Sequence, residues 1–201
     1  MKTIRAVLAM FDAINTRVLI LGRAIGLVAL GLMVLVILTQ IFFRYVLNNA
    51  LPWPEEAARA LMIWMMAMVA PSAYRYTGFV SINMLHEYIP ARLKNYLILS
   101  ILLLCTFVSI IMLQHAWTHF SSPLLFDSSG LNRLLQDTGI NQLLGTQIQF
   151  RTAYIYLAMS VFLTLILMVS LELVMRQFAR IIWGNESFPS PKLPNVMAVN
   201  S

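Results

Sequence analysis

The sequence predicts an all-α integral membrane protein with four transmembrane helices and both termini in the cytoplasm. Hydrophobic residues make up 60% of its 201 residues, and charged residues make up only 11%. Soluble domains carry about 25% charged residues, so this chain lacks the polar residues that a water-exposed surface needs. The composition excludes an ordinary soluble enzyme, and the single cysteine excludes an internal disulfide and a cysteine-based metal cluster.

Four apolar stretches predict the four helices. A membrane-spanning helix needs about 20 consecutive apolar residues, and charge-free runs of that length occur at 24–43, 95–114 and 152–171. A shorter run at 60–74 reaches spanning length if its helix begins near Glu55. The spans expected from these runs are, in chain order, about 22–46, 55–75, 95–116 and 152–174.

The segment before the first span has two open interpretations. Apolar residues recur on one side of a helix there, which is typical of an amphipathic segment lying on the membrane surface. These residues are Ile4, Val7, Leu8, Phe11 and Ile14. A partly ordered lead-in to the first span explains them equally well.

The distribution of Lys and Arg predicts the orientation. With four spans, ten basic residues fall on the side of the termini and four on the other side. Because basic residues gather in cytoplasmic loops, both termini are expected inside. The ten are Lys2, Arg5, Arg17, Arg23, Arg75, Arg92, Lys94, Arg176, Arg180 and Lys192; the four are Arg44, Arg59, Arg133 and Arg151. The net charge of +6 thus reflects topology, and no nucleic-acid partner is expected.

Two segments lie outside the four spans. In residues 120–150, Leu and Ile recur at three- and four-residue spacing, which predicts short helices at the outer membrane interface. The proline-containing tail at 184–201 is expected to be a disordered cytoplasmic segment. Residues 1–183 are therefore expected to form one membrane domain.

Small residues form two stripes that favour close helix packing. Gly22 and Gly26 lie one turn apart at the start of the first span. Ala60, Ala67 and Ala70 fall on one side of the second span. Small residues let helices approach closely in lipid, but the spacing leaves open whether the neighbour belongs to this chain or to another subunit.

The start of the second span carries a charged cluster. Glu55 and Glu56 lie in the first turn, where the helix dipole favours negative charge, and both can reach Arg59. Trp53 suits the headgroup level. We interpret the cluster as a capped, interface-anchored helix start. A catalytic carboxylate pair is disfavoured because the adjacent arginine stabilises the charged form of both acids.

The apolar runs of the first, third and fourth spans contain no ionisable residue. Ionisable residues inside a membrane usually mark ion or substrate pathways, so we expect no transport path and no catalytic site in this chain alone. His115 and His119 have a spacing that can bind zinc, but no third ligand is apparent, and we interpret them as interfacial histidines. Neither a metal nor a cofactor is expected.

Several motifs resemble the small membrane subunit, of DctQ type, of tripartite ATP-independent periplasmic (TRAP) transporters. The residues that carry the resemblance are Phe43-Arg44-Tyr45-Val46, Trp53-x-Glu55-Glu56-x-x-Arg59, Trp64, Tyr74-Arg75-x-x-Gly78 and the segment 80–85. Phe79 and Asn83 stand where the family commonly has histidine and aspartate. The match covers roughly residues 40–90, and the later helices match in hydropathy alone.

The resemblance implies a function that composition and spacing do not show. Such a subunit is a non-catalytic scaffold for a large sodium-coupled elevator subunit in the bacterial inner membrane. A periplasmic binding protein delivers the substrate, typically an organic acid. The structural and subunit-interface signature would comprise Arg44, Trp53, Glu55, Glu56, Arg59, Trp64 and Gly78.

Two other functions remain as alternatives. One is a membrane anchor for an electron-transfer enzyme, with His115 or His119 as a haem ligand. The other is a free-standing four-helix transporter that acts as a homodimer. The substrate cannot be read from this chain, because the partner proteins of such a system select it.

Overall fold

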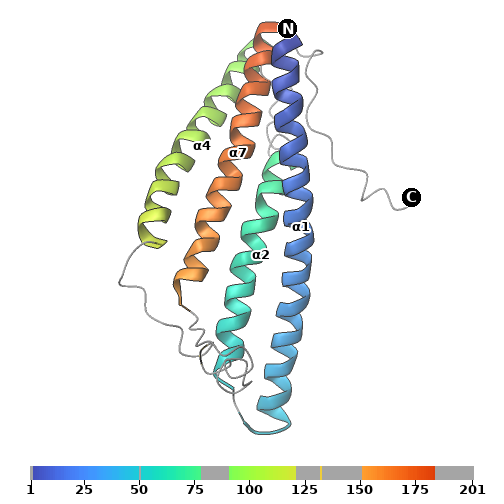
Figure 1. Cartoon of the computed structure of the whole chain (residues 1–201), viewed down its shortest axis with the longest axis vertical. Helices are drawn as coiled ribbons and strands as arrows, with labels where there is room; N and C mark the ends of the chain where they lie inside the picture. The colour runs from blue at the N-terminus through green and yellow to red at the C-terminus, as the bar shows by residue number, and fades with distance from the viewer. Residues whose placement is uncertain (1, 50, 78–90, 121–131, 133–150, 184–201) are drawn as a thin grey trace, which may run out of the picture.

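The computed structural model describes residues 2–49, 51–77, 91–120, 132 and 151–183. These residues contain four long helices, which confirms the predicted all-α class with four membrane-spanning candidates (Figure 1). The helices are α1 (Lys2–Tyr45), α2 (Trp53–Thr77), α4 (Ala91–Phe120) and α7 (Ala153–Trp183). The expected interfacial segment at 120–150, Gly78 and the tail at 184–201 lie outside the described residues, apart from the helix end at Phe120 and the single position Asn132.

The first helix is longer than a bilayer requires. At 1.5 Å per residue, the 44 residues of α1 extend about 66 Å, roughly twice the hydrocarbon thickness of a membrane. The segment that precedes the first apolar run is therefore neither a separate surface helix nor a partly ordered lead-in. It is the continuation of α1, and it packs its Leu8 against Ala179 of α7.

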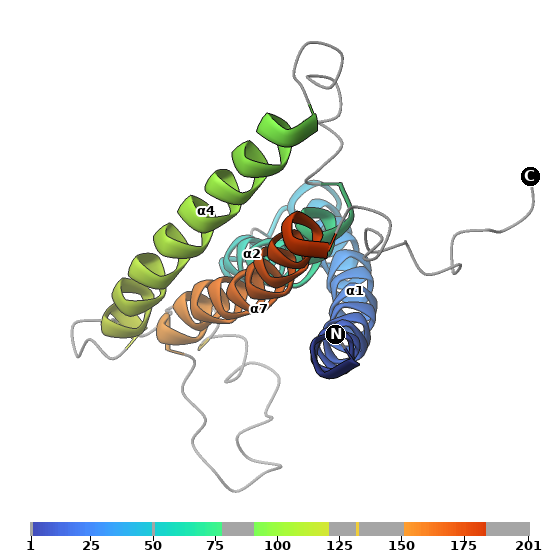
Figure 2. The ribbon, with the colours of Figure 1, turned by 90° about the horizontal axis from the view of Figure 1, so that it is seen from above.

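The four helices lie side by side and alternate in direction along the chain. Across Figure 1 the order is α4, α7, α2, α1, and Figure 2 shows α4 at one edge next to α7. The closely packed pairs are α1 with α2, α4 with α7, and α2 with α7. Near its N-terminus, α1 also reaches the C-terminal part of α7.

The core forms where all four helices meet at one level. Leu19 of α1, Ile98 and Leu102 of α4, and Val169 and Leu173 of α7 are buried together. Tyr74 of α2 packs against this cluster. Hydroxyl and amide groups also join α4 to α7, since Thr106 hydrogen-bonds Ser170, and Gln177 donates to the backbone carbonyl of Asn95 at 3.2 Å.

Glycine sets the close approach of α1 to α2. A side-chain carbon built on Gly22 would lie 3.0 Å from the backbone oxygen of Met68, and one built on Gly26 would overlap the Val69 side chain. A carbon built on Gly31 would meet nothing within 4 Å. The first two glycines therefore face α2, whereas Gly31 lies in open space.

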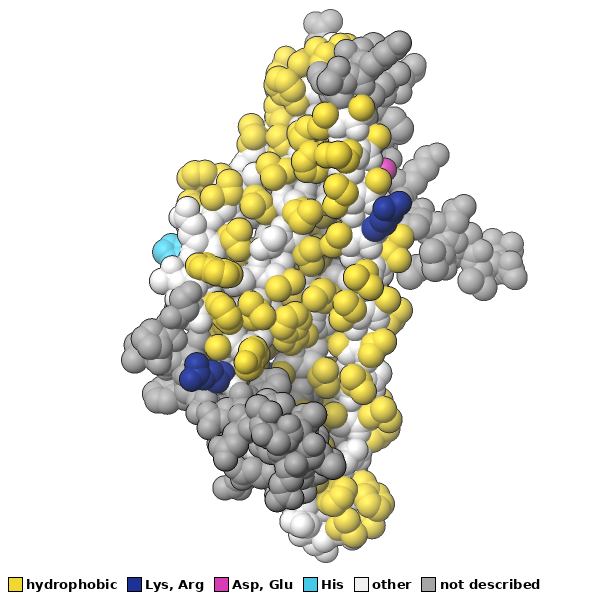
Figure 3. Space-filling model, viewed as in Figure 1, with side chains coloured by type: hydrophobic (Ala, Val, Ile, Leu, Met, Phe, Trp, Pro, Cys, Tyr) yellow, Lys and Arg dark blue, Asp and Glu magenta, His cyan; other side chains and the backbone are white. Residues whose placement is uncertain are grey.

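The outer surface is apolar along the length of the bundle. Hydrophobic side chains cover most of the described face in Figure 3. Large exposed hydrophobic residues of the bundle include Leu27, Leu104 and Phe107. Such a surface is unsuited to water and suits lipid or another membrane protein.

Candidate functional site

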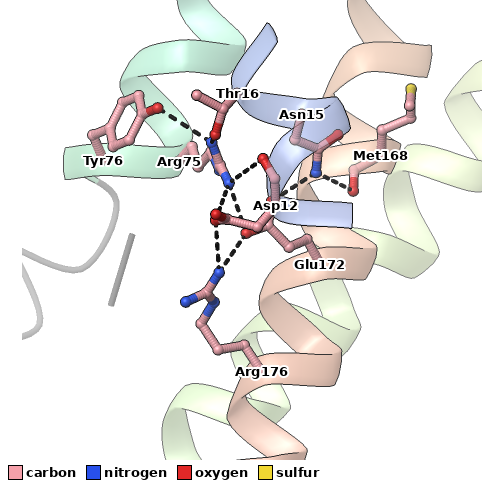
Figure 4. Close-up of polar contacts among 8 residues, drawn as sticks. All are labelled: Asp12, Asn15, Thr16, Arg75, Tyr76, Met168, Glu172 and Arg176. Atoms are coloured by element: carbon pink, nitrogen blue, oxygen red, sulfur yellow. Dashed lines mark hydrogen bonds and ion pairs between the residues drawn. The ribbon is translucent and has the colours of Figure 1, made fainter. Parts of the chain in front are cut away.

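A cluster of four charged side chains joins three helices near the N-terminal end of α1. We call it the charge quartet; its members are Asp12 of α1, Arg75 of α2, and Glu172 and Arg176 of α7 (Figure 4). Arg75 is 1% exposed and Glu172 is 0% exposed, so the two charges at its centre are removed from solvent. The quartet brings acids and bases of three different helices together.

Charges of opposite sign alternate around the quartet. Arg75 Nη2 lies 2.7 Å from Asp12 Oδ1 and 2.8 Å from Glu172 Oε1. Arg176 Nη2 lies 2.9 Å from the same Asp12 oxygen and 2.8 Å from the same Glu172 oxygen. Each guanidinium therefore contacts both carboxylates, and the four formal charges sum to zero.

Polar groups of the neighbouring turns add hydrogen bonds to the site, although the buried Nε of Arg75 has no hydrogen-bond partner among the described residues. Asn15 Nδ2 donates to the second carboxylate oxygen of Glu172 at 2.7 Å and to the backbone oxygen of Met168 at 3.3 Å. Arg75 Nη1 donates to Thr16 Oγ1 at 2.8 Å and to Tyr76 Oη at 3.2 Å. Both oxygens of the Glu172 carboxylate and both terminal nitrogens of Arg75 thus have partners.

The arrangement is suited to holding three helices together. Burying a charged side chain away from water costs on the order of several kcal/mol per ion. This cost is offset only where an opposite charge lies close by and further hydrogen bonds are made. The quartet has both, but loss of one member would leave its partner buried and uncompensated. Every charge of the quartet faces an opposite charge within the quartet itself.

The quartet lies outside the charge-free runs of the spans, because Asp12, Glu172 and Arg176 flank these runs and Arg75 follows the apolar part of α2. From the sequence alone, Arg75 and Arg176 count among the basic residues of the cytoplasmic side, with no partner assigned to either of them. In the structure three helices meet there and cover Arg75 and Glu172, whereas the side chain of Asp12 stays 46% exposed. The spacing of Glu172 and Arg176, one turn apart beside an apolar run, was the available signal, but it did not reveal which residues of α1 and α2 they contact.

The charged cluster at the start of α2 lies at the opposite end of that helix. Arg59 Nη2 and Glu55 Oε1 form the expected pair at 3.0 Å, but their side chains are 62% and 70% exposed. Trp53 begins the helix, and Trp64 is half-buried. Arg44 stacks over Tyr45 at the end of α1, 5.9 Å from the ring centre.

The three alanines of the stripe on α2 differ in burial. Ala67 is buried, whereas Ala60 and Ala70 are half-buried. Gly22 and Gly26 face α2 of the same chain. Substitutions at Ala67, Gly22 or Gly26 would therefore act first on packing within this protein.

The histidines considered as ligands lie on the surface of one helix. His115 and His119 are both exposed near the end of α4. In the described parts of the chain, no group of three His, Cys, Asp or Glu side chains could hold a metal ion. Within the described helices, no observation supports the electron-transfer anchor.

The helices and the buried quartet define a multi-pass α-helical membrane protein. Residues 33–180 match the model of the family described as tripartite ATP-independent periplasmic transporters, DctQ component. Because the match covers most of the chain, this protein belongs to the DctQ family and is a component of a TRAP transporter. No curated protein and no solved structure gives a significant match.

Proposed function

We propose that this chain is the non-catalytic small permease subunit of a TRAP transporter in the bacterial inner membrane. In this role it scaffolds a large, sodium-coupled elevator subunit, and a periplasmic binding protein delivers an organic acid to the pair. The observation that carries the proposal is the family match over residues 33–180. The charge-compensated quartet supports it, because a scaffold needs fixed helices and has no need of a charged path.

The quartet would act as a permanent clamp in such a scaffold. It ties α1 and α2 to α7 at one end of the bundle, and the hydrogen bonds between α4 and α7 extend the connection to the fourth helix. A rigid small subunit gives the moving parts of a large partner a fixed surface. Such a clamp is consistent with the scaffold role.

We further propose that both termini lie in the cytoplasm, which places the quartet at the cytoplasmic end. The distribution of Lys and Arg, ten against four, supports this orientation. A cysteine introduced at Asn48, between α1 and α2, should react with an impermeant thiol reagent added from the periplasm, in a chain whose Cys105 is replaced. A cysteine at Asn195 should react only after the membrane is opened, and the reverse pattern would contradict the orientation.

The function is tested by reconstitution with its expected partners. The chain should co-purify with a co-expressed large permease subunit, and uptake of an organic acid should require this chain, the large subunit and the binding protein together. Full uptake without this chain would contradict the scaffold role. Uptake by this chain alone would support a free-standing transporter, and a haem absorption band in the purified protein would support an electron-transfer anchor.

A further inference from the structure

The register between α1 and α2 shows that their apolar stretches are not level. The helices run antiparallel, with Thr16 beside Arg75, Gly22 beside Met68, and Gly26 beside Met65 and Val69. Arg59 comes six residues before Met65, so at 1.5 Å per residue it lies level with about residue 32 of α1. By the same reasoning, Glu55 lies level with about residue 36.

This register places an exposed ion pair beside the middle of a charge-free helix. Residues 24–43 of α1 contain no Asp, Glu, Lys or Arg, and residues 32–36 lie at the centre of that run. The Glu55–Arg59 pair on α2 is exposed to more than half of its surface. In Figure 1, α1 correspondingly continues past the start of α2.

The ion pair and the apolar run share one side of the helix pair. Glu55, Arg59, Met62 and Met66 follow one another at spacings of four, three and four residues, so they form one exposed stripe on α2. Tyr74 packs against the core cluster that contains residues of α7, and Arg75 contacts Glu172 of α7, so these two residues mark the different side of α2 that is covered by α7. Figure 2 shows α7 next to α2. At 100° per residue, the exposed stripe lies on the side of α2 that is turned away from α7.

A matching stripe runs along α1. Leu30, Val34, Ile37 and Ile41 are exposed and follow the same spacing. With Gly22 and Gly26 facing α2, the helical rotation turns this stripe to the same side as Glu55 and Arg59. We call the combined surface, made by the two stripes within residues 30–41 and 55–66, the α1–α2 face.

Neither lipid nor water suits the whole of the α1–α2 face. If the apolar run of α1 is centred in the bilayer, the Glu55–Arg59 pair lies in hydrocarbon, where charged side chains are expensive. If the charge-free part of α2 is centred in the bilayer instead, Ile37 and Ile41 near the end of α1 lie beyond the hydrocarbon layer. At either level, a surface with both apolar and polar groups is needed to cover the face.

We infer that the α1–α2 face is the surface that docks the large permease subunit. The inference rests on the proposed function, and it goes beyond it by choosing one side of one helix pair. The partner surface that fits is an apolar helix for Ile37 and its neighbours, with a hydrogen-bond donor or a basic group beside the exposed Glu55 carboxylate. The apolar surface of α4 on the opposite side of the bundle faces lipid in this arrangement.

Exchanging the charges of Glu55 and Arg59 tests whether this pair serves docking to the partner or the stability of this chain. The variant that combines Glu55→Arg with Arg59→Glu keeps the pair on α2 but reverses its direction. We expect at least a tenfold loss of co-purification with the co-expressed large subunit, with only a small fall in the melting temperature of this chain purified alone, because the pair is exposed and only its favourable direction at the helix start is lost. Unchanged co-purification would overturn the inference. Failure of the unaltered chain to co-purify would instead overturn the proposed function.

Two matched positions test the apolar part of the face. Ile37→Gln should weaken co-purification, whereas Ile110→Gln, at a similarly exposed isoleucine of α4, should not. A photo-crosslinking residue at Met62 should capture the large subunit, and one at Val108 should not. Equal effects of the two isoleucine changes, or capture of a second copy of this chain from Met62, would overturn the inference.

Discussion

Two ion pairs in this protein share one sequence spacing and have opposite surroundings. Glu172 and Arg176 lie four residues apart at 2.8 Å, and Glu55 and Arg59 lie four residues apart at 3.0 Å. The first pair is 0% and 13% exposed, with Asp12 and Arg75 of other helices beside it. The second pair lies on a single helix and faces outward. The spacing makes each pair possible, but the neighbouring helices decide what the pair does.

The difference in burial predicts a difference in energetic role. An exposed pair at this spacing stabilises a helix by about 0.3–0.5 kcal/mol, because water already solvates both charges. A buried pair adds little net stability when it is intact, yet breaking it costs about 3–5 kcal/mol because one charge is left alone. The quartet should therefore contribute to the folding stability of the subunit, and the Glu55–Arg59 pair should contribute mainly to contacts made at its surface.

The largest effect is expected from Arg75→Gln. This change leaves Glu172, which is fully buried, with only Arg176 as its cationic partner, and the free energy of unfolding should fall by about 3–5 kcal/mol. Thermal unfolding in detergent measures the loss. Arg17→Gln, at an exposed arginine of α1, is the matched control and should change stability little. Equal losses in the two variants would remove the distinction between buried and exposed charge.

A smaller effect is expected from Gly26→Ala. The added methyl group would overlap Val69, whose branched side chain has little freedom to move in a helix. The shift of α1 away from α2 should destabilise the protein by about 1–3 kcal/mol and disturb the contact of Asp12 with Arg75.

The glycine comparison has its own control in the same helix. Gly31→Ala adds the same methyl group in open space and should be neutral, or stabilising by up to about 1 kcal/mol, because alanine favours helix more than glycine. If both variants lost stability equally, close approach of α1 to α2 at Gly26 would not be the cause.

The smallest effect on the chain itself is expected from Glu55→Gln. Since the carboxylate is exposed, its loss should change the free energy of unfolding by at most about 0.5 kcal/mol. Unfolding measured at low and high salt should show a correspondingly small dependence on ionic strength. A loss of several kcal/mol would show that this pair is a folding element like the quartet.

The helices were predictable because hydropathy is a local property. Each span is recorded in consecutive residues, so the all-α class with four spans follows from the sequence alone. The approach of Gly22 and Gly26 to α2 was available only as a tendency, because small residues permit close packing without naming the neighbour. The continuation of α1 to Lys2 was missed, since Asp12 and Arg17 interrupt the apolar pattern there.

The quartet was not predictable because its members are far apart in the chain. Asp12 and Arg75 are separated by 63 positions, and Arg75 and Glu172 by 97. Each alone is typical of a charged residue at the end of a span. Their meeting depends on the helix order and on the depth at which α1 crosses α7, and neither is recorded in any one segment.

The most direct test of the static clamp is the double variant Arg75→Met with Glu172→Gln. It removes one opposite pair, leaves Asp12 paired with Arg176 at 2.9 Å, and keeps an oxygen that can accept from Asn15. Uptake per assembled transporter is the quantity to measure, beside the stability of the subunit. The clamp predicts that most of the stability lost in Arg75→Gln returns and that uptake per complex equals that of the unaltered protein. Normal assembly with abolished uptake would contradict it, because the quartet would then take part in transport itself.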